Sequence, residues 1–149
     1  MALFEPHIAL ATSENTILLF DFHKKQMDHV FKGHTDYVRS VDFSYDGEYI
    51  ASASDDTTVK IWNKKGRYLE KNLTDNLDRV RVVKFSKEFL ATGSKDCNIY
   101  VYDSKSFEKV CVFQGHVTGI WSLTFTEGFL ASASDKPRIM LWNLNTKTV

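Results

Sequence analysis

Three side chains of the types that form a hydrolase triad lie close together in this 149-residue sequence: Ser52, His34 and Asp56. A serine nucleophile needs an exposed hydroxyl, a base within hydrogen-bond reach and donors for an oxyanion. Ser52 instead lies within the run Ala51-Ser52-Ala53, and no Gly-x-Ser-x-Gly turn surrounds it. The sequence therefore predicts no catalytic residue and a protein that is not an enzyme.

The cysteines give little support for metal or redox chemistry. Cys97 and Cys111 are 14 residues apart and lack the Cys-x-x-Cys spacing of a zinc site. They also suggest no disulfide framework, which fits a reducing compartment. We expect no metal site, no cofactor and an intracellular location, either cytoplasmic or nuclear.

Composition narrows the classes of partner. The 19 basic and 19 acidic residues give a formal net charge of zero, whereas a dedicated binder of nucleic acid or anionic membrane usually has a large basic excess. No apolar run reaches the roughly 18 residues that a membrane span needs, and the first residues do not resemble a secretory leader. We expect a globular protein without membrane contact, and we do not favour nucleic acid as its partner.

The elements that must position these side chains follow from an internal repeat. The run Tyr49–Asn63 matches Phe89–Asp103 and Phe129–Asn143 without gaps, and His7–Asp21 is a more divergent copy. The four starts, at 7, 49, 89 and 129, are 42, 40 and 40 residues apart. A fixed period of this length is typical of solenoids and propellers, so the repeat decides the fold class.

Each repeat unit contains short runs of aromatic and β-branched residues, which are typical of β-strands. Turn sequences such as Asp46-Gly47 and Lys65-Gly66 separate these runs. No segment has the pattern of an amphipathic helix. In the second unit the pattern predicts four strands, near Val38–Phe43, Tyr49–Ser54, Thr58–Asn63 and Tyr68–Lys71.

The period, the Gly-His dipeptides at 33–34 and 115–116, and the closing Trp62-Asn63 and Trp142-Asn143 resemble the WD40 repeat family. The resemblance covers essentially the whole chain. It implies an all-β fold, a WD40-type β-propeller segment of four-stranded antiparallel blades. We expect a single repeat region over residues 1–149, with units at approximately 1–33, 34–75, 76–115 and 116–149.

The same resemblance gives His34, Ser52, Asp56 and Trp62 a structural role. They occupy the positions of a buried relay in which the indole donates to the serine, the serine reaches the histidine, and the aspartate orients the imidazole. The other units depart from it. The third has Asn76, Thr92, Asp96 and Tyr102, and the fourth has His116, Ser132 and Trp142 but Lys136 at the aspartate position. Only the second unit is expected to form the complete relay.

The repeats predict an incomplete ring. The sequence pattern begins at the second strand of the first unit and ends after the third strand of the last unit, which gives roughly 14 strands, about three and a half blades. Three explanations remain open: a segment cut from a longer propeller, which we favour, closure by a second copy, or completion by a partner chain. Exposed strand edges and blade faces at both ends predict association.

The resemblance also implies a binding platform on the narrow face around the central channel. The expected partner-binding residues are Tyr37, Arg39, Asp55, Arg79, Arg81, Lys95, Trp121 and Asp135, with Gly119 beside them. Tyrosine, tryptophan and arginine are typical of interface hot spots, and several arginines suit an acidic or phosphorylated peptide. The expected function is a protein-interaction scaffold; the alternative is a subunit of a ribonucleoprotein or RNA-processing assembly whose cations meet RNA phosphates. Arg79 and Arg81 could instead be solvated or paired with Asp78.

Overall fold

The computed structural model describes residues 1–136 and 138–148; Pro137 and Val149 lie outside it. Within these residues fifteen strands form four antiparallel sheets, three with four strands and the last with three. The strands are β1 (Ala2–Phe4), β2 (His7–Ala11), β3 (Thr16–Asp21), β4 (Gln26–Lys32), β5 (Val38–Phe43), β6 (Tyr49–Ser54), β7 (Val59–Asn63), β8 (Tyr68–Leu73), β9 (Val80–Phe85), β10 (Phe89–Ser94), β11 (Asn98–Asp103), β12 (Lys109–Gln114), β13 (Ile120–Thr126), β14 (Phe129–Ser134) and β15 (Ile139–Asn143). The expected all-β fold of antiparallel blades is confirmed. The described residues contain no helix that is long and apolar enough to cross a membrane.

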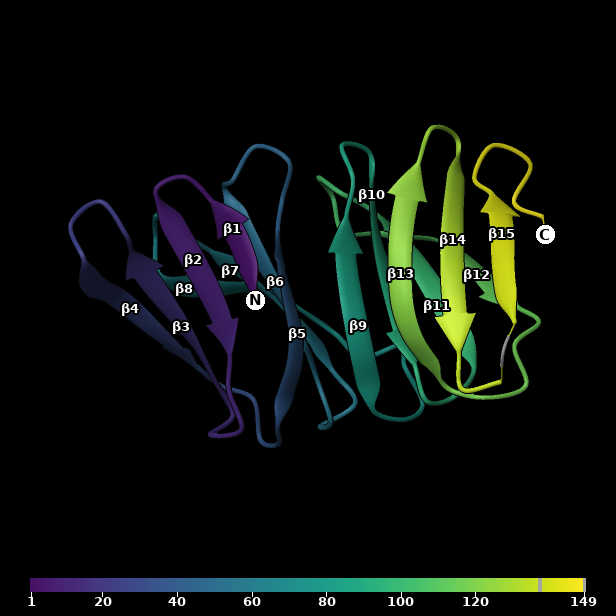
Figure 1. The fold of residues 1–149 in the computed structure, drawn as a ribbon, viewed down its shortest axis with the longest axis horizontal. Coiled ribbons are helices and arrows are strands. Elements are labelled where there is room, and N and C mark those ends of the chain that lie inside the picture. The colour runs from purple at the N-terminus through teal and green to yellow at the C-terminus, as the bar shows by residue number, and fades with distance from the viewer. Residues whose placement is uncertain (137, 149) are drawn as a thin grey trace.

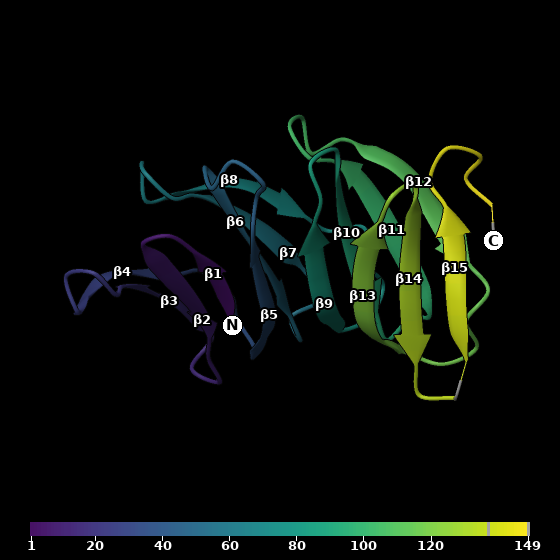
Figure 2. The same cartoon turned by 45° about the horizontal axis from the view of Figure 1, so that its top comes forward.

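Each sheet is one blade, and its strands follow one another in chain order. We call them blades 1 to 4: β1–β4, β5–β8, β9–β12 and β13–β15. The first strands of the blades, β1, β5, β9 and β13, lie side by side along the inside of an arc (Figure 1). The later strands of each blade lie farther from this inner row, and the arc is open between blades 1 and 4 (Figure 2).

The start of the chain differs from the sequence prediction. We expected the first unit to lack its first strand, but Ala2–Phe4 pairs with β2 across a two-residue turn at Glu5-Pro6, with Leu3 opposite Ile8. Blade 1 is therefore four-stranded. A three-residue strand is too short to show an alternating pattern, so only its pairing with β2 reveals it. Blade 4 ends after its third strand, as expected.

The hydrophobic core lies between consecutive blades. The face of a blade that points to the next blade, its back face, carries small and β-branched residues; in blade 2 these are Ala51, Ala53, Val59 and Ile61, all fully buried. They contact larger residues on the front face of blade 3, among them Val80, Leu90 and Tyr102. Equivalent clusters join blade 1 to blade 2 and blade 3 to blade 4. Each fully buried aliphatic or aromatic side chain contributes about 1.5–3 kcal/mol to this packing.

Polar contacts add to the joint between blades 2 and 3. The backbone N–H groups of Val83 and Phe85 donate to Ser40 Oγ at 3.3 Å and to Asp42 Oδ2 at 2.9 Å. Just beyond the same end of β5, Lys105 of blade 3 pairs with Asp46 of blade 2. Desolvation opposes ionisation of Asp46, but hydrogen bonds from Lys105 and Ser44 outweigh it and lower the pKa of the carboxyl to about 2. Two neighbouring inner strands are thus held both by apolar packing and by fixed polar contacts.

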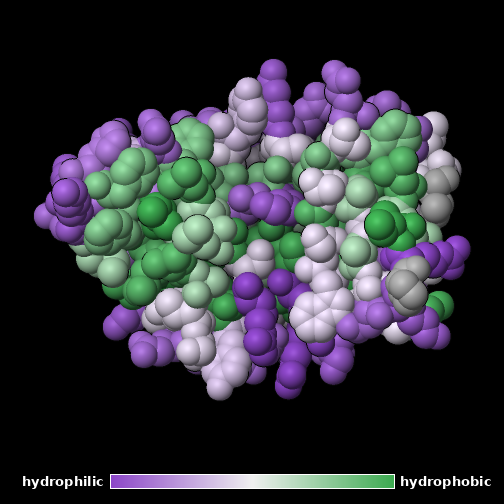
Figure 3. All heavy atoms as spheres, viewed as in Figure 1, coloured by the Kyte–Doolittle hydropathy of each residue, from purple (hydrophilic) through white to green (hydrophobic). Residues whose placement is uncertain are grey.

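The two end blades each leave one face uncovered. The front face of blade 1 presents Leu3, Ile8, Leu10, Leu18 and Phe20, and the back face of blade 4 presents Ile139 and Leu141, which are 78% and 48% exposed. In the view into the open side of the arc, hydrophobic residues gather over β1, β2 and β3 (Figure 3). Exposed apolar patches of this kind mark sites of association.

A bulkier residue at Gly93 should separate blades 3 and 4. A Cβ at Gly93 would lie 2.7 Å from Ile120 Cγ2 and 2.7 Å from Val82 Cγ1, so Gly93→Val should lower the free energy of urea-induced unfolding by about 1–3 kcal/mol. Ala133→Val is the matched control, because Ala133 occupies the same position in blade 4, where no blade of the same chain covers it. In the unassociated chain this variant should lose little stability. Equal losses of unfolding free energy in the two variants would show that the close contacts of Gly93 do not restrict which residue fits at this position.

Candidate functional site

The relay residues of blade 2 lie in one buried hydrogen-bonded row. Trp62 Nε1 is 2.8 Å from Ser52 Oγ, Ser52 Oγ is 2.7 Å from His34 Nε2, and His34 Nδ1 is 2.7 Å from Asp56 Oδ2. His34 lies in the segment before β5, Ser52 on β6 and Trp62 on β7, so the row crosses the sheet. A buried polar atom without a partner would cost about 1–3 kcal/mol, and each atom of this row has one.

One proton arrangement satisfies the whole row. Burial lowers the pKa of His34 although Asp56 opposes the shift, so the imidazole is neutral at neutral pH. Its Nδ1–H donates to Asp56, Nε2 accepts from the Ser52 hydroxyl, and the Ser52 oxygen accepts from the Trp62 N–H. Ser52 is completely inaccessible to solvent, so its hydroxyl cannot meet a substrate in this conformation.

Asp56 has partners that the sequence prediction missed. The backbone N–H of Thr35 donates to Oδ2 at 3.0 Å, and the Thr58 hydroxyl and N–H donate to Oδ1 at 2.6 and 2.9 Å. Desolvation opposes ionisation, but these hydrogen bonds and that of His34 prevail and lower the pKa of Asp56 to about 2. The Asp-Thr-Thr sequence was an available signal, because an aspartate commonly accepts from the backbone two residues on.

The corresponding rows in blades 3 and 4 are incomplete. In blade 4 His116 and Trp142 both contact Ser132, at 2.6 and 2.8 Å, but His116 Nδ1 is buried without a hydrogen-bond partner among the described residues. In blade 3 Thr92 donates to Asn76 at 3.2 Å. The hydroxyl of Tyr102 donates instead to Asp75, at 3.1 Å, which the sequence did not predict.

A second cluster forms where the inner strands begin. Near their starts β5, β9 and β13 each contain a register shift relative to the next strand, and the residues at the shifts are Arg39, Arg81 and Trp121. A β-bulge adds one residue to a strand and redirects its side chain. The same local irregularity therefore presents a large side chain from each of three blades to one region.

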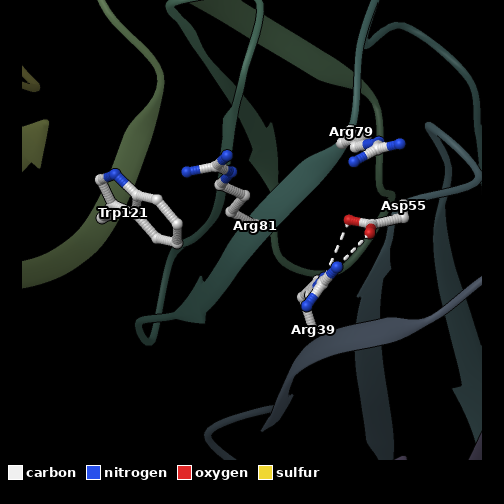
Figure 4. A pocket seen from close by; sticks show the side chains of 5 residues that line it. All are labelled: Arg39, Asp55, Arg79, Arg81 and Trp121. Carbon is white, nitrogen blue, oxygen red and sulfur yellow. Dashed lines mark hydrogen bonds and ion pairs between the residues drawn. The ribbon is translucent and has the colours of Figure 1, made fainter. Parts of the chain in front are cut away.

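These side chains line a pocket of about 330 Å³ together with Asp55 and Arg79. We call it the arginine pocket: Arg39, Asp55, Arg79, Arg81 and Trp121. Arg81 lies between Trp121 and Arg79, and Arg39 is directed at Asp55 (Figure 4). Three guanidinium groups against one carboxylate leave the lining with two net positive charges, although the whole chain is neutral.

Arg39 and Asp55 neutralise each other. Arg39 Nε donates to Asp55 Oδ1 at 2.9 Å and its Nη2 donates to Oδ2, which is a bidentate pair. The hydrogen bond from Arg39 is the main cause of the lowered pKa of Asp55, and the charges of Arg79 and Arg81 lower it further. Arg39 also lies 5.3 Å from the centre of the Tyr37 ring. We expected Arg39 to contribute a free cation, and its carboxylate partner argues against this.

Arg79 and Arg81 differ from Arg39. No salt bridge between described residues involves either of them. The Asp78 carboxylate accepts from the backbone N–H of Arg79, at 2.7 Å, and not from a guanidinium. The Arg81 guanidinium stacks 3.5 Å from the centre of the Trp121 ring, and its Nη1 is buried with no hydrogen-bond partner in the described part of the chain. Two positive groups are thus left for an incoming anion.

The other expected binding residues lie around the pocket without lining it. Tyr37 and Lys95 are exposed, and the Asp135 carboxylate accepts from the Trp121 indole N–H. A Cβ at Gly119 would lie 3.1 Å from Lys95 Cα, so the start of blade 4 packs directly on the turn that holds Lys95. All five lining residues belong to the set predicted from the sequence; the stacking of Arg81 on Trp121 and the unpartnered nitrogen could be seen only in three dimensions.

Comparison with known proteins places three of the repeats in a family. The family described as WD domain, G-beta repeat, matches residues 25–63, 70–103 and 107–143. The chain is 27% identical to nuclear distribution protein PAC1-2 of Uncinocarpus reesii and 29% identical to E3 ubiquitin-protein ligase COP1 of Arabidopsis thaliana. These alignments cover 91% and 93% of this chain but only 35% and 21% of the two relatives. This chain is also 24% identical to anaphase-promoting complex subunit cdc20 of Dictyostelium discoideum. That alignment covers 89% of this chain and 28% of the relative.

Removing the indole donor should test the relay. Trp62→Phe leaves Ser52 without its donor and removes packing volume, so the unfolding free energy in urea should fall by about 1–3 kcal/mol. Tyr102→Phe should cost less, because Tyr102 donates to Asp75, whose partly exposed carboxylate keeps its pair with Lys109. If both variants lose the same stability, the relay has no special contribution.

Acid should weaken blade 4 through His116. Burial, and to a smaller extent the charge of Arg138, lowers the pKa of His116 below its usual value of 6.5. The unfolded imidazole therefore binds a proton first, so stability is full above 6.5 and falls as the pH drops through the folded-state pKa. The unfolding free energy of His116→Asn, measured in urea at about pH 7 and about pH 5, should depend less on pH than that of the wild type. An unchanged pH dependence would argue against this role of His116.

Proposed function

Since this chain belongs to the WD40 repeat family, whose repeats generally serve as non-enzymatic protein-interaction scaffolds, we propose that it binds a protein partner at the arginine pocket. The observation that carries the proposal is the pair of guanidinium groups of Arg79 and Arg81, which line one pocket and form no salt bridge with any described residue. Guanidinium groups donate charge-assisted hydrogen bonds to carboxylates and phosphates, so an anionic ligand group is favoured there.

The chemistry of the pocket favours an acidic or phosphorylated peptide. A guanidinium can donate two parallel hydrogen bonds to a carboxylate or phosphate, and Arg79 and Arg81 both face the pocket. The Trp121 side chain is 53% exposed and offers apolar surface next to these donors. Aromatic and arginine side chains together are the usual anchors of protein interfaces.

The paired groups would limit which peptides are accepted. Asp55, held ionised by Arg39, lies on one side of Arg79, and Asp135 accepts from Trp121 on the other side of the cluster. A carboxylate or phosphate of the ligand placed near Asp55 or Asp135 would be repelled by a like charge. The pocket thus suits one anionic group with apolar neighbours better than a long acidic run, and we infer an intracellular site of action, cytoplasmic or nuclear.

Reversing the two free cations tests the proposal. Arg79→Glu with Arg81→Glu should reduce binding of a fluorescent phosphoserine peptide, measured by polarisation, by at least about tenfold, since two attractive contacts become repulsive. The double variant Lys65→Glu with Lys87→Glu makes the same change in net charge in the β7–β8 and β9–β10 turns, at the strand ends away from the pocket. It should bind the peptide normally. Normal binding by the arginine variant, or equal losses in both, would place the partner elsewhere.

RNA binding is the alternative function, and the salt dependence of binding separates it from peptide binding. A single-stranded RNA bound through phosphates should lose affinity steeply as salt is raised, because counterions are released on binding. A peptide held partly by Trp121 should lose less. Stronger binding of an RNA oligonucleotide than of the peptide, with a steep salt dependence, would favour the ribonucleoprotein function.

A further inference from the structure

The two uncovered end faces of the arc are the two halves of a joint that the chain forms three times within itself. The back-face positions of blade 4 are those buried in blades 1, 2 and 3. Ala131 and Ala133 correspond to Ala51 and Ala53, and Ile139 and Leu141 correspond to Val59 and Ile61, according to the repeat register. The blade 2 residues are fully buried beneath blade 3, whereas Ile139 is 78% exposed.

The front face of blade 1 supplies the opposite half. Cross-strand pairing places Leu3, Ile8 and Phe20 in one row and Leu10 opposite Leu18 in the next. In blade 4 the positions of Ile8 and Phe20 are filled by Leu130 and Trp142, which are buried against blade 3. Leu10 replaces the relay serine, so this face has an apolar residue where the other blades have a hydroxyl.

The shapes of the two faces are complementary. Ser122, Thr124, Ala131, Ala133 and Ile139 surround a shallow hollow of about 150 Å³ on the back of blade 4. Side chains of the same small size on the back of blade 3 receive Ile120, which would touch any Cβ placed on Gly93. The larger residues of the blade 1 front face have the size to enter such a hollow.

Polar groups are also matched. In the joint between blades 2 and 3, Ser40 and Asp42 accept from backbone N–H groups of β9. Ser122 and Thr124 occupy the same two positions in blade 4. Ser122 pairs with Ala133 as Ser40 pairs with Ala53. Thr124 pairs with Ala131 as Asp42 pairs with Ala51. Leu3 stands at the position of Phe85, one of the two donors, because Leu3 pairs with Ile8 and Phe85 with Leu90, the second residues of β2 and β10.

We propose that a second copy of this chain covers these faces, with the front face of blade 1 of one copy docked on the back face of blade 4 of the other. The contact is head-to-tail, and the two surfaces that meet are different. Two copies can form two such joints if the arcs close on each other, and longer assemblies form if they do not. The end faces are separate from the arginine pocket, so this inference does not rest on the proposed function.

Complementary variants give the sharpest test. Leu3 is 64% exposed and Ile139 is 78% exposed, so Leu3→Arg and Ile139→Arg should fold normally while placing a charge in the front face or the back face. In sedimentation equilibrium the wild-type chain should associate at micromolar concentration, and each variant alone should be monomeric. An equimolar mixture should form a species of two chains, because the intact front face of Ile139→Arg meets the intact back face of Leu3→Arg.

The control is Val117→Arg, which changes an apolar residue of similar exposure, 68%, outside both faces and should associate like the wild type. Circular dichroism checks the fold. If an arginine variant has lost its sheet signal, the serine variant of the same residue, Leu3→Ser or Ile139→Ser, replaces it. A monomeric wild-type chain, variants that associate like the wild type, or a mixture that stays monomeric would each overturn the proposal. A single joint in the mixture would support it.

Discussion

Every sheet in this structure is apolar on both faces, so each blade must be covered on two sides. The chain meets this constraint by packing the front of one blade on the back of the preceding one. Small residues such as Ala51 and Gly93 on the back leave room for large ones such as Ile120 on the front. Close contact of this kind fixes the separation of adjacent inner strands, because protein interiors are close-packed and resist displacement.

The buried polar row of blade 2 is part of this packing and not separate from it. Trp62 donates to Ser52 while its ring lies 5.4 Å from Phe31 of blade 1, so one side chain joins the relay to the joint. Trp142 has the same two contacts in blade 4, with Ser132 and, at 4.9 Å, with Phe113. The difference is the carboxylate: Asp56 completes the row in blade 2, whereas in blade 4 no described residue contacts His116 Nδ1 as Asp56 contacts that of His34.

The arginine pocket depends on the same joints. Its lining residues come from three blades, and they converge because β5, β9 and β13 are held side by side with their bulges at the same end. The asymmetry of the pocket then follows from the residue that lies opposite each arginine. Arg39 has a carboxylate opposite it in Asp55, whereas the corresponding partner of Arg81 is Lys95, which cannot neutralise it.

The sequence by itself determined the repeat, the strand order and the positions of the large side chains, because a forty-residue period and apolar alternation are local properties of the chain. It predicted β5 and β6 to the residue, and it identified all five residues of the arginine pocket within a larger set. The sequence did not predict strand β1, because three residues are too few to show a period and only their pairing with β2 defines the strand.

Only the tertiary structure decided which charges are free. Arg39 and Arg81 occupy equivalent positions of the repeat, and their difference arises from contacts with Asp55, which follows β6, and with Trp121 of blade 4. The same holds for Tyr102, whose hydroxyl donates to Asp75 and not to Thr92. Hydrogen bonds and ion pairs depend on distances of a few tenths of an ångström between segments far apart in the chain, and these distances are set by how the blades pack.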